Sequence, residues 1–208
     1  MFKRVPPASS LNLIRRSQEN SQLLLLSKTL TKTTTESENK NVIVFSEKRI
    51  VGYSPKQMFN VVADVESYHE FVPYCRRSVV TLRHPKRISA NLCVGFRPFF
   101  NISYTSHVTL VKPYLITAVC KDVKIFDHLK TVWKFTPTSE EDLNPKECLI
   151  DFAVSFSFKS SSHSMVSKLF LDSIVRDNVR AFIDRTEQIY GPPSRKMEQK
   201  SVVIRTGQ

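Results

Sequence analysis

Histidine and cysteine are the side chains to test first for chemistry, because they ligate metals and act as nucleophiles or bases. The sequence has five histidines and four cysteines. None of them forms a C-x-x-C pair, a His-x₃-His pair or a mixed cluster with metal-ligand spacing. His128 follows Asp127 directly, so we interpret it as a turn or surface histidine rather than a base. We therefore predict no metal site, no catalytic residue and four free thiols in a reducing compartment.

The segment 64–75, which we call the hook, offers chemistry of a different kind. Its sequence, Asp-Val-Glu-Ser-Tyr-His-Glu-Phe-Val-Pro-Tyr-Cys, ends in a cluster of apolar and aromatic residues around a proline. Such residues exclude water and bind apolar groups. We predict that Phe71, Val72, Pro73 and Tyr74 form the mouth of an apolar cavity; ordinary core packing is the alternative.

A well-marked helix leads into the hook. Ser54-Pro55-Lys56-Gln57 combines an N-cap serine, proline at the first helical position and the glutamine of a capping box. Met58, Val61, Val62 and Val65 then follow at the spacing of one buried helical stripe. Pro73 should end the helical region at or before Val72, because the residue before proline is disfavoured in the α conformation.

Most of the chain after the hook alternates between apolar and polar residues, which is typical of antiparallel strands with one buried face. Together with a first strand before the helix, the predicted strands are 42–53, 88–96, 100–110, 114–121, 129–136 and 150–158. A long helix, about 164–190, follows and is ended by Gly191-Pro192-Pro193. We expect an α+β fold in which a curved antiparallel sheet of about six or seven strands wraps this helix on its concave face.

The final helix has two apolar faces. Val175, Val179, Phe182, Ile183 and Thr186 lie on one side of its second half. In its first half the apolar residues lie on roughly the opposite side, and these are Val166, Leu169, Phe170 and Ile174. A loop could cover the second face, or the first half of the helix could line a cavity or meet a membrane.

The ends of the chain differ in composition from the middle. Residues 1–35 have one acid, six bases and many Ser and Thr, which is typical of a mitochondrial or plastid transit segment; a disordered basic tail is the alternative. We divide the chain into a transit segment and linker (1–41), a folded domain (42–191) and a basic tail (192–208). No stretch approaches the ~20 apolar residues that span a bilayer, so we expect any membrane contact to be peripheral. The net charge of +12 suits an anionic membrane surface or nucleic acid and does not choose between them.

The order of these elements and the hook sequence resemble the coenzyme Q-binding protein family of the START-like, helix-grip superfamily. The resemblance covers about residues 42–191, and its hook motif is more specific than its strand motifs. The other matching segments are 46–53 (SEKRIVGY), 94–96 (VGF), 104–110 (YTSHVTL), 126–135 (FDHLKTVWKF) and 151–158 (DFAVSFSF). Tyr74 stands where tryptophan is common in the family, and Arg97-Pro98 interrupts a variable loop.

The resemblance implies a mitochondrial START-like domain that holds ubiquinone or a related prenyl lipid between sheet and final helix. It implies a carrier or chaperone without a catalytic cofactor, in peripheral contact with the matrix side of the inner membrane. It would serve respiration or quinone biosynthesis, with complexes of either pathway as partners, whereas a nucleic-acid partner is not expected. Strand parity and helix face select as cavity-lining candidates Leu92, Val94, Phe96, Phe152, Val154, Phe156, Leu169 and Phe170. Trp133 is instead expected in the core.

Two other functions remain open from the sequence. The superfamily includes polyketide aromatases and cyclases, which place polar groups inside the cavity, and His107 with Tyr104 or Asp151 would be the set to find there. It also includes ribosome-associated proteins, and a basic surface would suit RNA. Basic and aromatic residues do not interleave on one predicted exposed strand face, which weakens that alternative.

Overall fold

A computed structural model describes residues 42–96, 100–120, 126–139, 142, 144–159 and 161–206, with side chains described except at 96, 100, 161–175 and 206. The predicted transit segment therefore lies outside the described residues. The described residues 42–206 belong to one compact unit.

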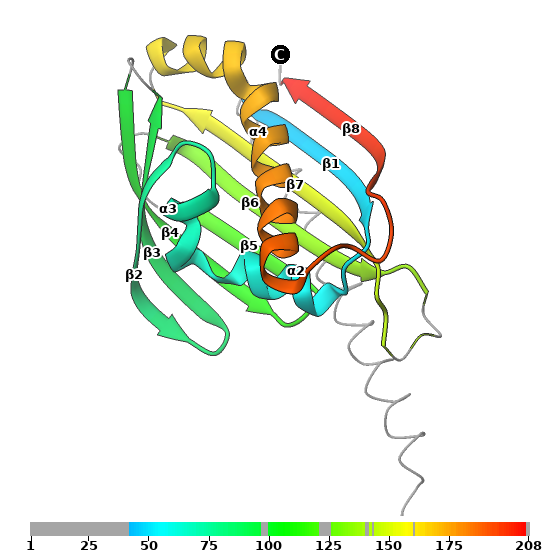
Figure 1. Ribbon diagram of the computed structural model, residues 1–208. Helices are drawn as coiled ribbons and strands as arrows, with labels where there is room; N and C mark the ends of the chain where they lie inside the picture. The colour runs from blue at the N-terminus through cyan, green and yellow to red at the C-terminus, as the bar shows by residue number, and fades with distance from the viewer. Residues whose placement is uncertain are drawn as a thin grey trace, which may run out of the picture. The chain divides into compact units, whose positions relative to one another are not determined.

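One eight-stranded antiparallel sheet dominates the unit, and it curves around the final helix (Figure 1). Its strands lie in the order β2-β3-β4-β5-β6-β7-β1-β8. Their bounds are β1 Ile43–Val51, β2 Cys75–His84, β3 Arg87–Phe96, β4 Phe100–Val111, β5 Leu115–Cys120, β6 Phe126–Pro137, β7 Cys148–Phe158 and β8 Glu198–Thr206. The strands from β2 to β7 follow one another along the chain, as a meander, and β1 closes on β7.

Four helical segments lie between the strands. They are α2 Pro55–Ala63, the 3₁₀ turn η1 Val65–Ser67, α3 Tyr68–Phe71 and the long α4 Ser161–Tyr190. The predicted capping box is present, since Ser54 Oγ accepts from the backbone N–H of Gln57 at 3.2 Å. Val72 is already extended, as Pro73 requires. Among the described residues, none of the helices has the length and apolarity needed to cross a membrane.

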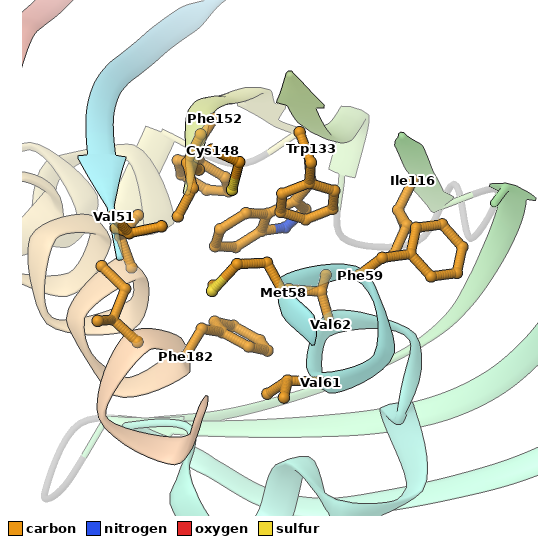
Figure 2. Close-up of a cluster of buried hydrophobic side chains, with 14 of the residues drawn as sticks. Val51, Met58, Phe59, Val61, Val62, Ile116, Trp133, Cys148, Phe152 and Phe182 are labelled. Carbon is orange, nitrogen blue, oxygen red and sulfur yellow. The ribbon is translucent and has the colours of Figure 1, made fainter. Parts of the chain in front are cut away.

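The core lies between the sheet and the helices. Figure 2 shows Met58 of α2, Trp133 of β6 and Phe182 of α4 pointing toward one another. The rings of Trp133 and Phe182 are 5.0 Å apart, and Phe152 of β7 lies 4.3 Å from Trp133. Four residues of the predicted second-half stripe of α4, Val179, Phe182, Ile183 and Thr186, are buried, whereas the side chain of Val175 lies outside the described set. The first-half stripe, 166–174, falls on side chains outside the described set.

The fold class is confirmed, but the sheet has eight strands rather than six or seven. The two edge strands, β2 and β8, are absent from the six predicted ranges, and β8 lies in segment 192–208, for which we predicted no strand. The segment turns back across Gly52, where Ser194 N–H donates to the Gly52 carbonyl at 2.9 Å. A Cβ on Gly52 would lie 2.4 Å from the Arg195 backbone nitrogen, so only glycine allows this close crossing.

Candidate ligand-binding site

An apolar cavity of about 270 Å³ lies between the middle of the sheet and the helices α2, α3 and α4. The sheet contributes side chains from β3 to β7, and the hook contributes the rim. The described lining residues are Val62, Val65, Tyr68, Val72, Pro73, Tyr74, Cys75, Leu92, Val94, Ile102, Tyr104, Ser106, Val108, Ile116, Ala118, Cys120, Phe126, Leu129, Thr131, Trp133, Phe152, Val154, Phe156, Phe158, Asn178 and Phe182. Size and lining suit a small apolar ligand.

The hook reaches this cavity through Val72, Pro73 and Tyr74, which are three of the four residues predicted for its mouth. Tyr74 has a backbone φ of 66°, which is rare for an aromatic residue, and its side chain is 38% exposed. Two backbone hydrogen bonds hold this turn: Cys75 N–H donates to Val72 at 3.1 Å, and Gly95 N–H donates to Tyr74 at 2.9 Å. The strained residue therefore lies between the cavity and the surface, where such conformations often serve function.

Phe71, the fourth residue predicted for the mouth, is not among the residues that line the cavity. Its ring packs edge-on against Phe182 of α4 at 5.2 Å, and the guanidinium of Arg185 lies 5.3 Å from the ring centroid. Arg185 also forms an ion pair with Glu70 at 2.6 Å. Phe71 thus fastens the hook to α4, and the residues after it form the rim.

Five of the eight residues predicted for the cavity wall are among its described lining residues. Leu92 and Val94 of β3 line the cavity, as do Phe152, Val154 and Phe156 of β7. The predicted side chains of Phe96, Leu169 and Phe170 lie outside the described set. Whether the described wall residues contact a ligand is a separate question, taken up below.

The prediction missed the middle of the wall, on β4, β5 and β6. The alternation within 100–110 places Ile102, Tyr104, Ser106 and Val108 of β4 on one face, so a parity signal was available, and all four line the cavity. On β6, however, Phe126 and Leu129 both face the cavity, although simple alternation would separate them. A register shift between Phe126 and His128 in the β6–β7 pairing reverses the parity there.

The cavity is neutral. Among its described lining residues there is no Asp, Glu, His, Lys or Arg. Burial raises the pKa of the Tyr68 and Tyr104 hydroxyls, so both stay protonated at neutral pH. Tyr68 donates its hydroxyl hydrogen to the Val62 carbonyl. Burial likewise raises the pKa of the Cys75 thiol, which keeps it a weak nucleophile.

The chain matches the model of the polyketide cyclase/dehydrase and lipid transport family over residues 51–183, which is more than half of its length. The chain belongs to this family. It is 44% identical over 150 residues to the mitochondrial coenzyme Q-binding protein COQ10 of Drosophila melanogaster, covering 72% of this chain and 61% of that protein. It is 41% identical over 149 residues to the COQ10 homolog B of Xenopus laevis, covering 72% and 60%. The chain thus spans about six-tenths of these relatives, and the expected resemblance to coenzyme Q-binding proteins is confirmed.

Solved structures of other proteins have the same fold as this chain. The di-domain ARO/CYC StfQ of the steffimycin biosynthetic pathway superposes with a TM-score of 0.62 at 15% identity, covering 85% of this chain and 62% of that chain. At this identity the likeness establishes the helix-grip fold alone.

The polar set that would indicate a cyclase of this family is not assembled in the cavity. Tyr104 lines it, but His107 lies on an exposed part of β4 and contacts Ser89 Oγ at 3.1 Å. Asp151 pairs with Lys48 at 3.2 Å on the opposite face of the sheet. His128 lies on β6 rather than in a turn, and its Nε2 is 2.7 Å from Ser155 Oγ. The described residues hold no cluster of three metal-ligating side chains.

Proposed function

We propose that this protein binds ubiquinone, or a related prenyl quinone, in the cavity between the sheet and α4. It acts as a carrier or chaperone that supports respiratory electron transport and quinone biosynthesis. The observation that carries the proposal is the neutral, apolar cavity with a rim formed by the hook. The similarity to coenzyme Q-binding proteins supports a quinone over other apolar molecules.

The cavity volume suits a quinone ring better than a whole prenyl quinone. A cavity of about 150 Å³ accommodates benzene. The volume of about 270 Å³ therefore accommodates a substituted ring and the start of its tail. Each buried CH₂ contributes about 0.8 kcal/mol, so even a short tail segment adds affinity. The rest of a long tail leaves past Val72, Pro73 and Tyr74.

A tail that leaves at the rim needs an apolar environment outside the protein. Arg76 and Arg77 follow the rim and are exposed, as are Val79 and Leu82 on the edge strand β2. We assign this surface to peripheral contact with the matrix side of the mitochondrial inner membrane, where arginines attract anionic lipid heads. Co-sedimentation with anionic vesicles should fall in an Arg76→Glu/Arg77→Glu variant, and unchanged sedimentation would refute the contact.

Binding without catalysis is the simplest use of this site. General acid–base catalysis needs a group that exchanges protons near neutral pH. The ionisable groups of the described cavity wall are tyrosines and cysteines, and burial raises the pKa of Tyr68, Tyr104 and Cys75. Delivery of the quinone to a respiratory complex or a biosynthetic enzyme would need no such group.

The direct test of the function is to purify the protein from quinone-replete cells, extract it with organic solvent and identify the lipids by mass spectrometry. We expect a prenyl quinone in near-stoichiometric amount. An extract without quinone, or one dominated by phospholipid, would contradict the proposal. Import of the chain into isolated mitochondria, with and without residues 1–41, tests the location.

A further inference from the structure

One polar side chain in the cavity wall has a buried oxygen atom without a hydrogen-bond partner among the described residues. Asn178 lies on α4, one turn before Phe182, and lines the cavity. Its Oδ1 atom is buried and has no hydrogen-bond partner among the described residues. A buried polar atom without a partner is rare in folded proteins and calls for an explanation.

Asn178 is also a poor residue for its position in the helix. Asparagine lowers helix stability relative to leucine, because its side chain competes for backbone hydrogen bonds. An apolar residue would both favour the helix and remove the unpartnered atom. Local stability therefore does not explain Asn178, whereas a ligand that supplies the missing partner would.

A carboxamide suits the headgroup of a quinone in both of its redox states. The amide nitrogen donates hydrogen bonds, and the amide oxygen accepts them. A quinone carbonyl only accepts, whereas a quinol hydroxyl also donates. Rotation about the last side-chain bond exchanges the two ends of the amide, so one residue can bind either form.

No other described lining residue offers a free hydrogen-bonding group on the α4 side of the cavity. The Tyr68 hydroxyl is already used by the Val62 carbonyl. The hydroxyls of Tyr104, Ser106 and Thr131 come from β4 and β6, on the sheet side. Among the described lining residues of α4, which are Asn178 and Phe182, only Asn178 can form a hydrogen bond.

We propose that Asn178 is a specificity-determining residue that hydrogen-bonds an oxygen of the quinone or quinol ring and so distinguishes a prenyl quinone from a plain isoprenoid. This inference rests on the proposed function and adds the residue that recognises the headgroup.

The experiment compares wild-type protein with Asn178→Leu and with Asp177→Leu. Asp177 is exposed and adjacent, and its replacement gives a similar gain in helix propensity away from the cavity. Trp133 is the only tryptophan and lines the cavity, so quenching of its fluorescence reports binding of a short-tailed ubiquinone. The rise in unfolding temperature reports binding of farnesene, an isoprenoid without oxygen.

We expect Asn178→Leu to bind the quinone, and the quinol, about tenfold more weakly, which is the loss of one hydrogen bond. Its farnesene response should be unchanged, and its unfolding temperature should be equal to or above that of wild type. Asp177→Leu should bind the quinone like wild type. These results together would separate recognition from a structural role.

Three results would overturn the inference. Equal quinone affinity in Asn178→Leu and wild type would show that the amide contributes nothing. A lower unfolding temperature with parallel losses for quinone and farnesene would make Asn178 structural. Wild-type protein that binds farnesene but no quinone would refute the proposed function itself, and the role of Asn178 with it.

Discussion

Glu47 and Arg49 are charged residues that lie inside the fold, although charged side chains usually face solvent. Both lie on β1 and are buried, Glu47 being 1% exposed. Glu47 lies opposite Phe152 on one side and Val202 on the other. Arg49 Nε donates to Glu47 Oε1 at 2.5 Å, so the pair neutralises itself inside the fold. Strand parity with Phe45 and Val51 places both residues inward; their charge alone suggests the opposite.

Replacing one member of this ion pair should destabilise the protein strongly, whereas replacing both members should not. We expect Glu47→Leu or Arg49→Met alone to lower the free energy of unfolding by about 3–5 kcal/mol, because each leaves a buried charge uncompensated. The double variant should be within about 1 kcal/mol of wild type or more stable, as apolar replacements of buried pairs often are. Urea denaturation of the four proteins measures the cycle. Single variants that cost less than about 1 kcal/mol would show that water reaches the pair.

His128 gives a residue-scale prediction about pH. Burial lowers its pKa, and the positive charge of Lys130 lowers it further. Well above pH 6.5, the ordinary pKa of histidine, the ring is neutral in both the folded and the unfolded chain. As the pH falls below 6.5, the unfolded chain takes up the proton first, so the free energy of unfolding falls until the folded pKa is passed.

The unfolding temperature of wild type should therefore decrease between pH 7 and pH 5 more than that of a His128→Gln variant. Thermal melts in one buffer series, followed by circular dichroism, measure the difference. Parallel pH profiles for the two proteins would mean that His128 keeps its ordinary pKa in the fold.

At the scale of elements, the strongest predictions came from local signals with a clear physical cause. The capping box at Ser54 and the stop at Pro73 fix the start of α2 and the end of α3. Alternation placed the β3, β4 and β7 side chains, because one face of each strand is buried. Alternation could not predict which β6 side chains face the cavity, because the register shift after Phe126 depends on the pairing of β6 with β7.

The sequence of β8 alone did not identify it as a strand. Its Val202-Val203-Ile204 run is typical of a strand, but it lies in a basic segment beyond the helix stop at Gly191. What makes it a strand is β1, which pairs with it from Ile43 to Ile50. The packing of Phe71 against α4 could not be inferred either, because its partners Phe182 and Arg185 lie more than a hundred residues away along the chain.

The crossing at Gly52 allows a test of how β8 is held. Gly52→Ala places a methyl group against the Arg195 backbone, so we expect a loss of about 1–3 kcal/mol and faster amide hydrogen exchange in β8. Gly191→Ala is the matched control, because it strains a residue at φ 82° with open space around it. The control should destabilise the end of α4 and leave β8 exchange unchanged. Equal exchange of β8 in both variants would mean that the crossing does not hold the strand.

At the scale of the whole molecule, the sheet, the hook and α4 act together as a container. The described sheet supplies an apolar wall, the clamp between Phe71 and Arg185 fixes the hook to α4, and the strained turn at Tyr74 forms the rim. The fold class followed from the order of elements. The proposed ligand did not follow from the order of elements, because an apolar cavity accepts many molecules; it rests on the similarity to coenzyme Q-binding proteins.

The measurement that tests the central claim most directly is the quinone content of purified wild type, Ala118→Phe and Val119→Phe, each made in quinone-replete cells. Ala118 lines the cavity, and the next residue of β5 faces the other side of the sheet. A phenylalanine ring needs about 150 Å³, so at residue 118 it fills more than half of the cavity volume. We predict near-stoichiometric quinone in wild type and Val119→Phe, and at least a tenfold loss in a folded Ala118→Phe protein. Equal quinone in all three proteins would contradict the account, because the quinone would then be bound elsewhere.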